Sequence, residues 1–106
     1  MTTTGLDNLD IKKIQSVFNL HPEIEKAILF GSRAKGNYKP ASDIDLTLVG
    51  NDLTLTIQQT IENELDDLLL PYKFDISIYH TISSNELVDH IERVGQLFFQ
   101  NKKAKS

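Results

Sequence analysis

Two short segments constrain this chain more than any other part of its sequence. In the first, the apolar residues 26–30 are followed at once by Gly31 and Ser32. In the second, after ten further residues, Asp43 and Asp45 stand two positions apart within an apolar run. A strand sends alternate side chains to opposite faces of a sheet, so the two carboxylates share one face and the apolar residues share the other. The pattern predicts a strand that ends in a tight turn, and a second strand with one acidic face and one buried face.

Adjacent carboxylates repel each other unless a positive charge lies between them, and hard cations such as Mg²⁺ prefer carboxylate oxygens. A turn whose backbone N–H groups face an anion can bind a phosphate. Gly31 lets the backbone approach such a phosphate closely, and Ser32 adds a hydroxyl donor. Each signal alone has a structural explanation, because many Gly-Ser pairs are ordinary turns and many paired acids line a solvated sheet edge. Together they indicate a site for a metal-bound phosphate and predict phosphoryl or nucleotidyl transfer.

A third acid stands on another alternating segment. Residues 73–79 alternate apolar and polar side chains, with Asp75 on the polar face, which predicts a strand. If this strand neighbours the strand of the acid pair, Asp75 lies beside that pair. Three converging carboxylates can hold two divalent ions about 3.5–4 Å apart. One ion would bind a nucleoside triphosphate and the other would activate an attacking hydroxyl, with Asp75 as metal ligand and proton acceptor.

Three basic residues follow the Gly-Ser pair closely enough in sequence to neutralise negative charge that develops on phosphate or pyrophosphate. They are Arg33, Lys35 and Lys39. The three histidines show no metal-ligand spacing, and we interpret them as surface or helix-capping residues. They are His21, His80 and His90.

The remaining periodicities predict an α/β fold, namely a small mixed sheet of three or four strands with helices packed on it. Helices alternate with strands along the chain, and Asp10 is expected to cap the first helix. The expected strands cover residues 26–30, 43–49 and 73–79, and the expected helices cover residues 11–20, 32–36 and 55–69 and a last segment from 83 to 98.

The last predicted helix opens with a capping box at residues 83–86, and its apolar stripe runs to Phe98. Residues 97–99 are three consecutive large apolar side chains and residues 68–70 are three consecutive leucines, which is more than one helix face can bury. The excess predicts an exposed apolar patch of the kind that marks an interface. The alternative is that Phe99 folds back onto the sheet edge.

Composition narrows the class of protein. A chain of 106 residues without repeats or linkers predicts one domain over 1–106, with a core over about 10–100 and a flexible basic tail over 101–106. The net charge of −4, with no basic cluster outside that tail, argues against direct nucleic-acid binding. No apolar stretch is long enough for a bilayer, and the start does not resemble a signal peptide. The absence of cysteine excludes disulfides and cysteine-bound zinc and fits the cytoplasm, which is the expected location.

The Gly-Ser pair, ten intervening residues and the Asp-Ile-Asp sequence resemble the signature of the DNA polymerase beta-like nucleotidyltransferase superfamily. The short length and the later acidic strand make the chain similar to the minimal nucleotidyltransferases within it. Lys35 stands where arginine is common, which keeps the charge but loses a bidentate fork. The resemblance implies phosphate contacts from the Gly-Ser pair and Mg²⁺ binding by the acids, and the residues concerned are Gly31, Ser32, Asp43, Asp45 and Asp75.

Minimal nucleotidyltransferases are often encoded beside a HEPN-domain protein, an all-helical RNase toxin. Some act as antitoxins by transferring AMP from ATP to a tyrosine hydroxyl of that toxin. The resemblance therefore implies an adenylyltransferase-like enzyme with Mg²⁺ as cofactor, ATP or another nucleoside triphosphate as substrate and a HEPN-type partner. Nothing after the last predicted helix could build a second domain, so we expect a partner or a homo-oligomer to complete the cleft. Two alternatives stay open: a weak or inactive module that neutralises the HEPN partner by occlusion, or an adenylyltransferase that acts on a small molecule.

Overall fold

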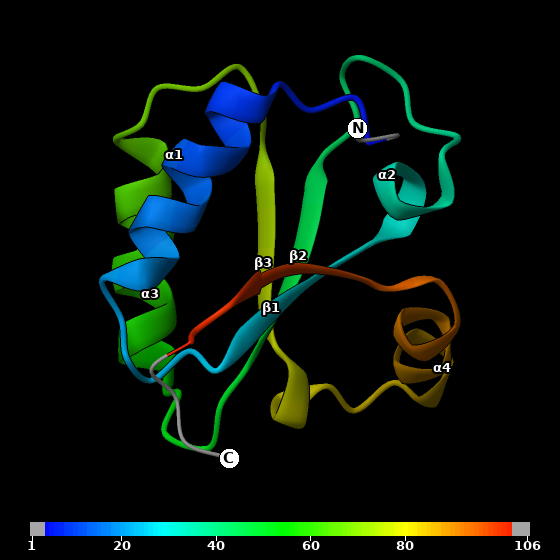
Figure 1. Cartoon of the computed structure of the whole chain (residues 1–106). Helices are drawn as coiled ribbons and strands as arrows, with labels where there is room; N and C mark the ends of the chain where they lie inside the picture. Colours follow the sequence, from blue (N-terminus) through cyan, green and yellow to red (C-terminus); the bar gives the residue numbers. More distant parts are fainter. Residues whose placement is uncertain (1–3, 103–106) are drawn as a thin grey trace.

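The structure is a computed structural model that describes residues 4–102. Its elements are α1 (Asn8–Asn19), β1 (Lys26–Phe30), α2 (Gly31–Lys35), β2 (Ile44–Val49), α3 (Leu55–Asp66), β3 (Phe74–Ile78), the 3₁₀ helix η1 (Tyr79–Thr81), α4 (Asn85–Val94) and β4 (Gln96–Gln100). The four strands form one sheet in the order β3-β2-β1-β4. Helices α1 and α3 lie together on one side of the sheet, and α2 and α4 lie together on the other (Figure 1).

The sheet combines both kinds of strand pairing. β1 pairs with β2 and with β4 in the antiparallel sense, whereas β2 and β3 are parallel. A parallel pair needs a crossover connection, and α3 supplies it. The predicted α/β fold with a small mixed sheet is therefore confirmed. The parallel pairing also brings the polar face of β3 beside that of β2.

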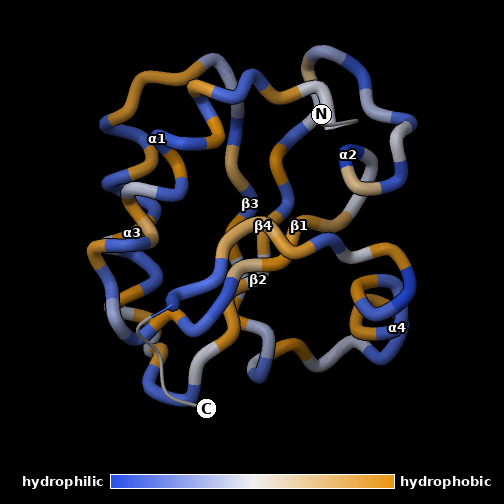
Figure 2. Tube along the Cα trace, viewed as in Figure 1, coloured by the Kyte–Doolittle hydropathy of each residue, from blue (hydrophilic) through white to orange (hydrophobic). Residues whose placement is uncertain are grey.

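One face of the sheet builds the hydrophobic core against α1 and α3. Figure 2 shows apolar segments gathered where the strands meet in the middle of the molecule. The strand residues on this face are almost fully buried, and they are Ala27, Leu29, Ile44, Leu46, Leu48, Ile76 and Ile78. The two helices bury their apolar stripes on them, with Ile14, Val17, Phe18, Ile61 and Leu65.

The prediction that the last helix continues to residue 98 is wrong beyond Val94. The structure ends α4 there, and residues 96–100 form β4, an edge strand antiparallel to β1. Gly95 has an extended backbone, with φ −61° and ψ 142°, which stops the helix. The free edge of β1 can then pair with the following segment, whose aromatic residues favour strands. The predicted capping box over residues 83–86 is displaced by one residue: Ser84 caps α4, and its side chain accepts a hydrogen bond from the Leu87 N–H.

Two other helix boundaries also differ from the prediction. α1 begins at Asn8, so Asp10 lies in its first turn and does not cap it. The Asp10 carboxylate instead accepts a hydrogen bond from the Tyr72 hydroxyl at 2.9 Å. α3 ends at Asp66 instead of residue 69, and Leu69 has a φ of 57°, which no α-helix can continue.

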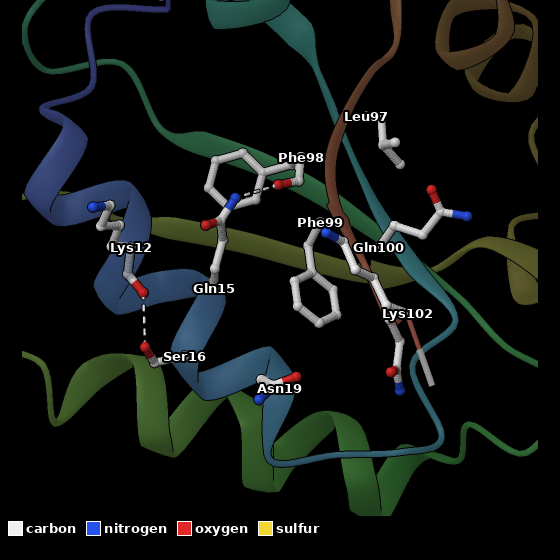
Figure 3. A pocket seen from close by; sticks show the side chains of 10 residues that line it. Lys12, Gln15, Ser16, Asn19, Leu97, Phe98, Phe99, Gln100 and Lys102 are labelled. Carbon is white, nitrogen blue, oxygen red and sulfur yellow. Dashed lines mark hydrogen bonds between the residues drawn. The ribbon is translucent and has the colours of Figure 1, made fainter. Parts of the chain in front are cut away.

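β4 and α1 enclose a groove of about 750 Å³ on the apolar side of the sheet. A bulge in the β1–β4 pairing lets Phe98 and Phe99 both approach Phe18, with ring centroids 6.3 and 5.7 Å away. The Gln15 side chain crosses the groove and donates to the Phe98 carbonyl at 2.8 Å (Figure 3). Phe99 thus packs back onto the core, as in the alternative above, whereas Leu97 is 59% exposed.

The C-terminal tail was expected to begin at residue 101. Asn101 is instead buried, and its N–H donates to the Glu25 carbonyl, which places it beside the start of β1. Lys102 of the predicted tail is exposed, and residues 103–106 lie outside the described residues. Within residues 4–102, no helix combines the length and the apolar character needed to cross a membrane.

Candidate active site

Two of the three predicted acids, Asp45 and Asp75, lie side by side on neighbouring strands. Asp43 directly precedes β2, and Asp45 is the second residue of that strand. In the parallel pair of β2 and β3, Asp45 lies opposite Asp75. Asp45 is half-buried, while Asp43 and Asp75 are exposed. The expected adjacency of the two strands is confirmed, and it brings Asp75 beside Asp45 on the polar face of the sheet.

Burial and the neighbouring acids raise the pKa of Asp45 to about 6. Desolvation is the largest cause, and the negative charges of Asp75 and Asp43 come next. A hydrogen bond with Asp75 also favours the protonated form of Asp45, whereas the positive charge of Arg33 opposes it. Without a cation, Asp45 therefore keeps its proton at mildly acidic pH. A bound cation would take the place of that proton.

The turn at the end of β1 lies directly against Asp45. Phe30, the last residue of β1, is the register partner of Asp45, and Gly31 follows it with a φ of 74°. This left-handed backbone conformation favours glycine. A Cβ atom at Gly31 would also collide with Oδ2 of Asp45. The backbone conformation thus favours glycine at position 31, with the Asp45 carboxylate close beside it, and Ser32 follows as the second residue of α2.

Arg33 has a different role from the one expected, because its side chain is only 1% exposed. Its Nη1 donates to the Thr4 carbonyl at 2.9 Å, and its Nη2 donates to the Ser42 carbonyl at 3.0 Å. The guanidinium also lies over the rings of Tyr38 and Tyr72, 5.2 and 5.3 Å from their centroids. Arg33 therefore holds the loop that leads into β2, and its buried donors are directed at carbonyl groups instead of at a phosphate.

Lys35 and Lys39 are both exposed. Lys35 is the last residue of α2, and Lys39 lies in the loop between α2 and β2. The Lys39 N–H donates to Ser42 Oγ at 2.8 Å, which helps to shape that loop. Cations that neutralise a phosphate must be accessible to solvent, and these two are. Their contact with a phosphate stays a prediction.

One residue that contacts the glycine turn was not predicted from the sequence patterns. His90, on α4, accepts a hydrogen bond at Nε2 from the Gly31 N–H at 3.1 Å. The two residues are 59 positions apart, so no local pattern could indicate the contact. Of the other histidines, His80 is exposed as expected, and His21 is half-buried and bonded to Glu64 at 2.6 Å.

The acids fit a metal ion that is held jointly with a substrate. Among residues 4–102, no three histidine or acidic side chains converge closely enough to hold an ion by themselves. Mg²⁺, however, is usually bound by one or two carboxylates together with substrate phosphates and water. Asp45 is hydrogen-bonded to Asp75, and the charge of Asp43 is close enough to raise the pKa of Asp45. The donor set therefore suits Mg²⁺ that arrives with a triphosphate.

The fold and this arrangement of acids define a nucleotidyltransferase core. The sequence matches the family model described as "Polymerase beta, Nucleotidyltransferase" over residues 12–104. The chain belongs to this family, as the resemblance implied, and its enzyme class is nucleotidyltransferase. A relative from Methanocaldococcus jannaschii described as a "putative protein adenylyltransferase" is 32% identical over 79 residues, which are 72% of this chain and 80% of that protein.

Solved toxin–antitoxin structures share the fold. A crystal structure of a toxin–antitoxin with AMP-PNP superposes with a TM-score of 0.68 at 22% identity, over 92% of this chain and 77% of that chain. A second complex contains a tri-AMPylated HEPN toxin of Shewanella oneidensis and an MNT antitoxin. It superposes with a TM-score of 0.67 at 19% identity, over 92% of this chain and 76% of that chain. At these identities the similarity concerns the fold.

Proposed function

We propose that this nucleotidyltransferase transfers AMP from ATP to a hydroxyl group of a partner protein and depends on Mg²⁺. The acceptor would be a tyrosine of a HEPN-type toxin, which the transfer neutralises, so that the chain acts as an antitoxin. The observation that carries the proposal is the pairing of Asp45 with Asp75 directly beneath the glycine turn at Gly31. The expected compartment is the cytoplasm, since the chain has no cysteine that would mark an oxidising one.

The acids and the turn would divide the chemistry between them. The oxygen of the acceptor hydroxyl bonds to the α-phosphorus of ATP, the bond from that phosphorus to the bridging oxygen breaks, and pyrophosphate leaves. Asp75, exposed and adjacent to Asp45, would take the hydroxyl proton. Asp43 and Asp45 would hold Mg²⁺, which when bound neutralises charge on the triphosphate. Gly31 and Ser32 would orient the phosphates.

Two comparisons support a protein as the acceptor. The M. jannaschii relative is described as a protein adenylyltransferase, and it is similar over most of its length. The Shewanella oneidensis complex, which shares the fold, contains an AMPylated HEPN toxin beside its antitoxin. Lys35, at the end of α2, and Lys39, in the loop that follows, are both exposed, and we propose that they neutralise the departing pyrophosphate.

One observation favours a second candidate function, a module that neutralises a HEPN partner by occlusion. Within residues 4–102 the three acids do not form a ready-made metal site, and Asp43 is exposed. Such a module would need no nucleotide. The two candidates therefore differ in whether neutralisation requires an intact Asp45.

Transfer of labelled AMP distinguishes the two candidates. The full chain is incubated with ATP labelled at the α-phosphate and with Mg²⁺, in the presence and absence of a HEPN protein encoded beside it. We expect label on the HEPN protein and loss of its RNase activity, and neither with Asp45→Asn. If the Asp45→Asn protein neutralises the toxin as well as the natural chain, occlusion is the function and AMP transfer is not.

Binding of ATP should depend on the divalent ion. A triphosphate next to Asp43, Asp45 and Asp75 is repelled unless a cation lies between the negative charges. We expect calorimetric titration to show ATP binding with Mg²⁺ and little or none with excess chelator. Equal affinity in the two conditions would contradict the assignment of these acids to a metal.

A further inference from the structure

The start of α2 is held from outside the helix. Gly31 is its first residue, and the first N–H groups of a helix have no partner within it. The Gly31 N–H instead donates to Nε2 of His90 at 3.1 Å. A backbone N–H can only donate, so Nε2 must be the acceptor in this hydrogen bond. The ring is fixed by a T-shaped contact with Phe30, with centroids 6.1 Å apart.

The other end of α2 is held by the same part of the chain. The Gln96 side chain, at the start of β4, donates to the Ala34 carbonyl at 2.8 Å. Residues of α4 and β4 thus form hydrogen bonds with both ends of α2, which is five residues long. A helix of this length has little stability of its own, because the free-energy cost of nucleating it exceeds the free energy gained from the hydrogen bonds of one turn. Contacts from α4 and β4 therefore help to set the position of Gly31, together with β1, which directly precedes it.

We propose that His90 is a positioning residue of the active site. Its imidazole holds Gly31 against Asp45 and leaves Ser32, the next residue, to present its N–H and hydroxyl to a phosphate. A Cβ at Gly31 would clash with Asp45 Oδ2, so Gly31 lies directly against the carboxylate of the proposed site. The part of this inference that concerns phosphate rests on the proposed function, whereas the part that concerns the turn does not.

The first test needs no nucleotide. In a ¹⁵N-labelled full chain, the Gly31 amide resonance and its hydrogen-exchange rate report the bond to residue 90. His90→Leu removes the acceptor, and we expect a displaced resonance and exchange faster by about an order of magnitude. His90→Gln provides a side-chain oxygen at similar reach and should largely restore both. His80→Leu, a change at an exposed histidine, should leave Gly31 unaffected.

The second test uses the enzyme with Mg²⁺ and ATP. His90→Leu should lower kcat/KM for AMP transfer roughly ten- to a hundredfold, as misplacement of a contacting group does. His90→Gln should restore most of the loss, and both proteins should keep a melting temperature close to that of the natural chain. If the Gly31 amide is unchanged in His90→Leu, or if kcat/KM is unchanged while the amide moves, His90 is not a positioning residue. If the natural chain transfers no AMP but the amide responds as expected, the proposed function fails and the hold on the turn stands.

Discussion

The two faces of the central sheet carry opposite chemistry on the same strands. On β2, Leu46 is fully buried against the helices, while Asp45 and Thr47 point to the other face. The hydroxyls of Thr47 and its register partner Ser77 are buried without a hydrogen-bond partner among residues 4–102. Unpaired hydroxyls and crowded carboxylates both cost free energy. One face therefore supplies stability and the other carries the proposed active site, and adjacent residues on β2 should respond to mutation in opposite ways.

The largest expected effect is on activity. Asp43→Asn combined with Asp45→Asn should reduce AMP transfer about a thousandfold or more, because the variant lacks the charges that we propose to bind the metal. The melting temperature should be unchanged or slightly higher, since the substitutions relieve repulsion. Asp66→Asn, at an exposed acid that ends α3, is the matched control and should retain activity. A clear fall in melting temperature for the double variant would mean that the acids are structural.

The opposite response is expected one residue further along β2. Leu46→Ala leaves a cavity in the core and should lower the free energy of unfolding by about 3 kcal/mol, or the melting temperature by about 15 °C. Urea denaturation measures the change, with Leu69→Ala as a control because Leu69 is 88% exposed. A loss below about 1 kcal/mol for Leu46→Ala would contradict the division between the two faces.

A smaller effect concerns pH. The pKa of Asp45 is raised from 3.8 to about 6, so between these values the folded chain binds more protons than the unfolded chain. Stability without metal should therefore fall as the pH rises from 4 to 6 and then level off, by about 1 kcal/mol after solvent screening. Urea denaturation at several pH values measures this decline. Asp45→Asn should abolish it, and an unchanged pH profile in that variant would assign the decline to other groups.

The smallest expected effect on stability concerns the predicted apolar patch at residues 97–99 of β4. Phe99 packs on Phe18, so Phe99→Glu would test stability, whereas Leu97 is 59% exposed and is the better probe of association. Leu97→Glu should weaken self-association or binding of the partner protein while ATP binding and the melting temperature change little. Sedimentation and partner pull-down measure this, with Leu20→Glu, at another exposed leucine, as the control. Unchanged association of a folded Leu97→Glu protein would mean that the surface at Leu97 is not an interface.

Much of the acidic face could be predicted because the alternation of side chains along a strand is a local property. Acids at alternate positions of a strand share a face wherever the strand lies, although β2 begins at Ile44, one residue after Asp43. Gly31 follows its strand directly. The position of Asp75 needed one further assumption, that its strand pairs with β2, and the structure confirms it. Local patterns of two to four residues were sufficient for these conclusions, and they placed the start of α4 to within one residue.

The remaining features depended on which surfaces meet in the folded chain. Residues 96–100 have a composition that suits a helix or a strand, and the free edge of β1 made them a strand. Arg33 can donate to any nearby acceptor, and in the folded chain it donates to carbonyl groups. His90 can accept from any nearby donor, and in the folded chain it accepts from the Gly31 N–H. A periodic pattern specifies a face, but the partner of a polar side chain is chosen by residues far away in the chain, and their positions are set only when the layers pack.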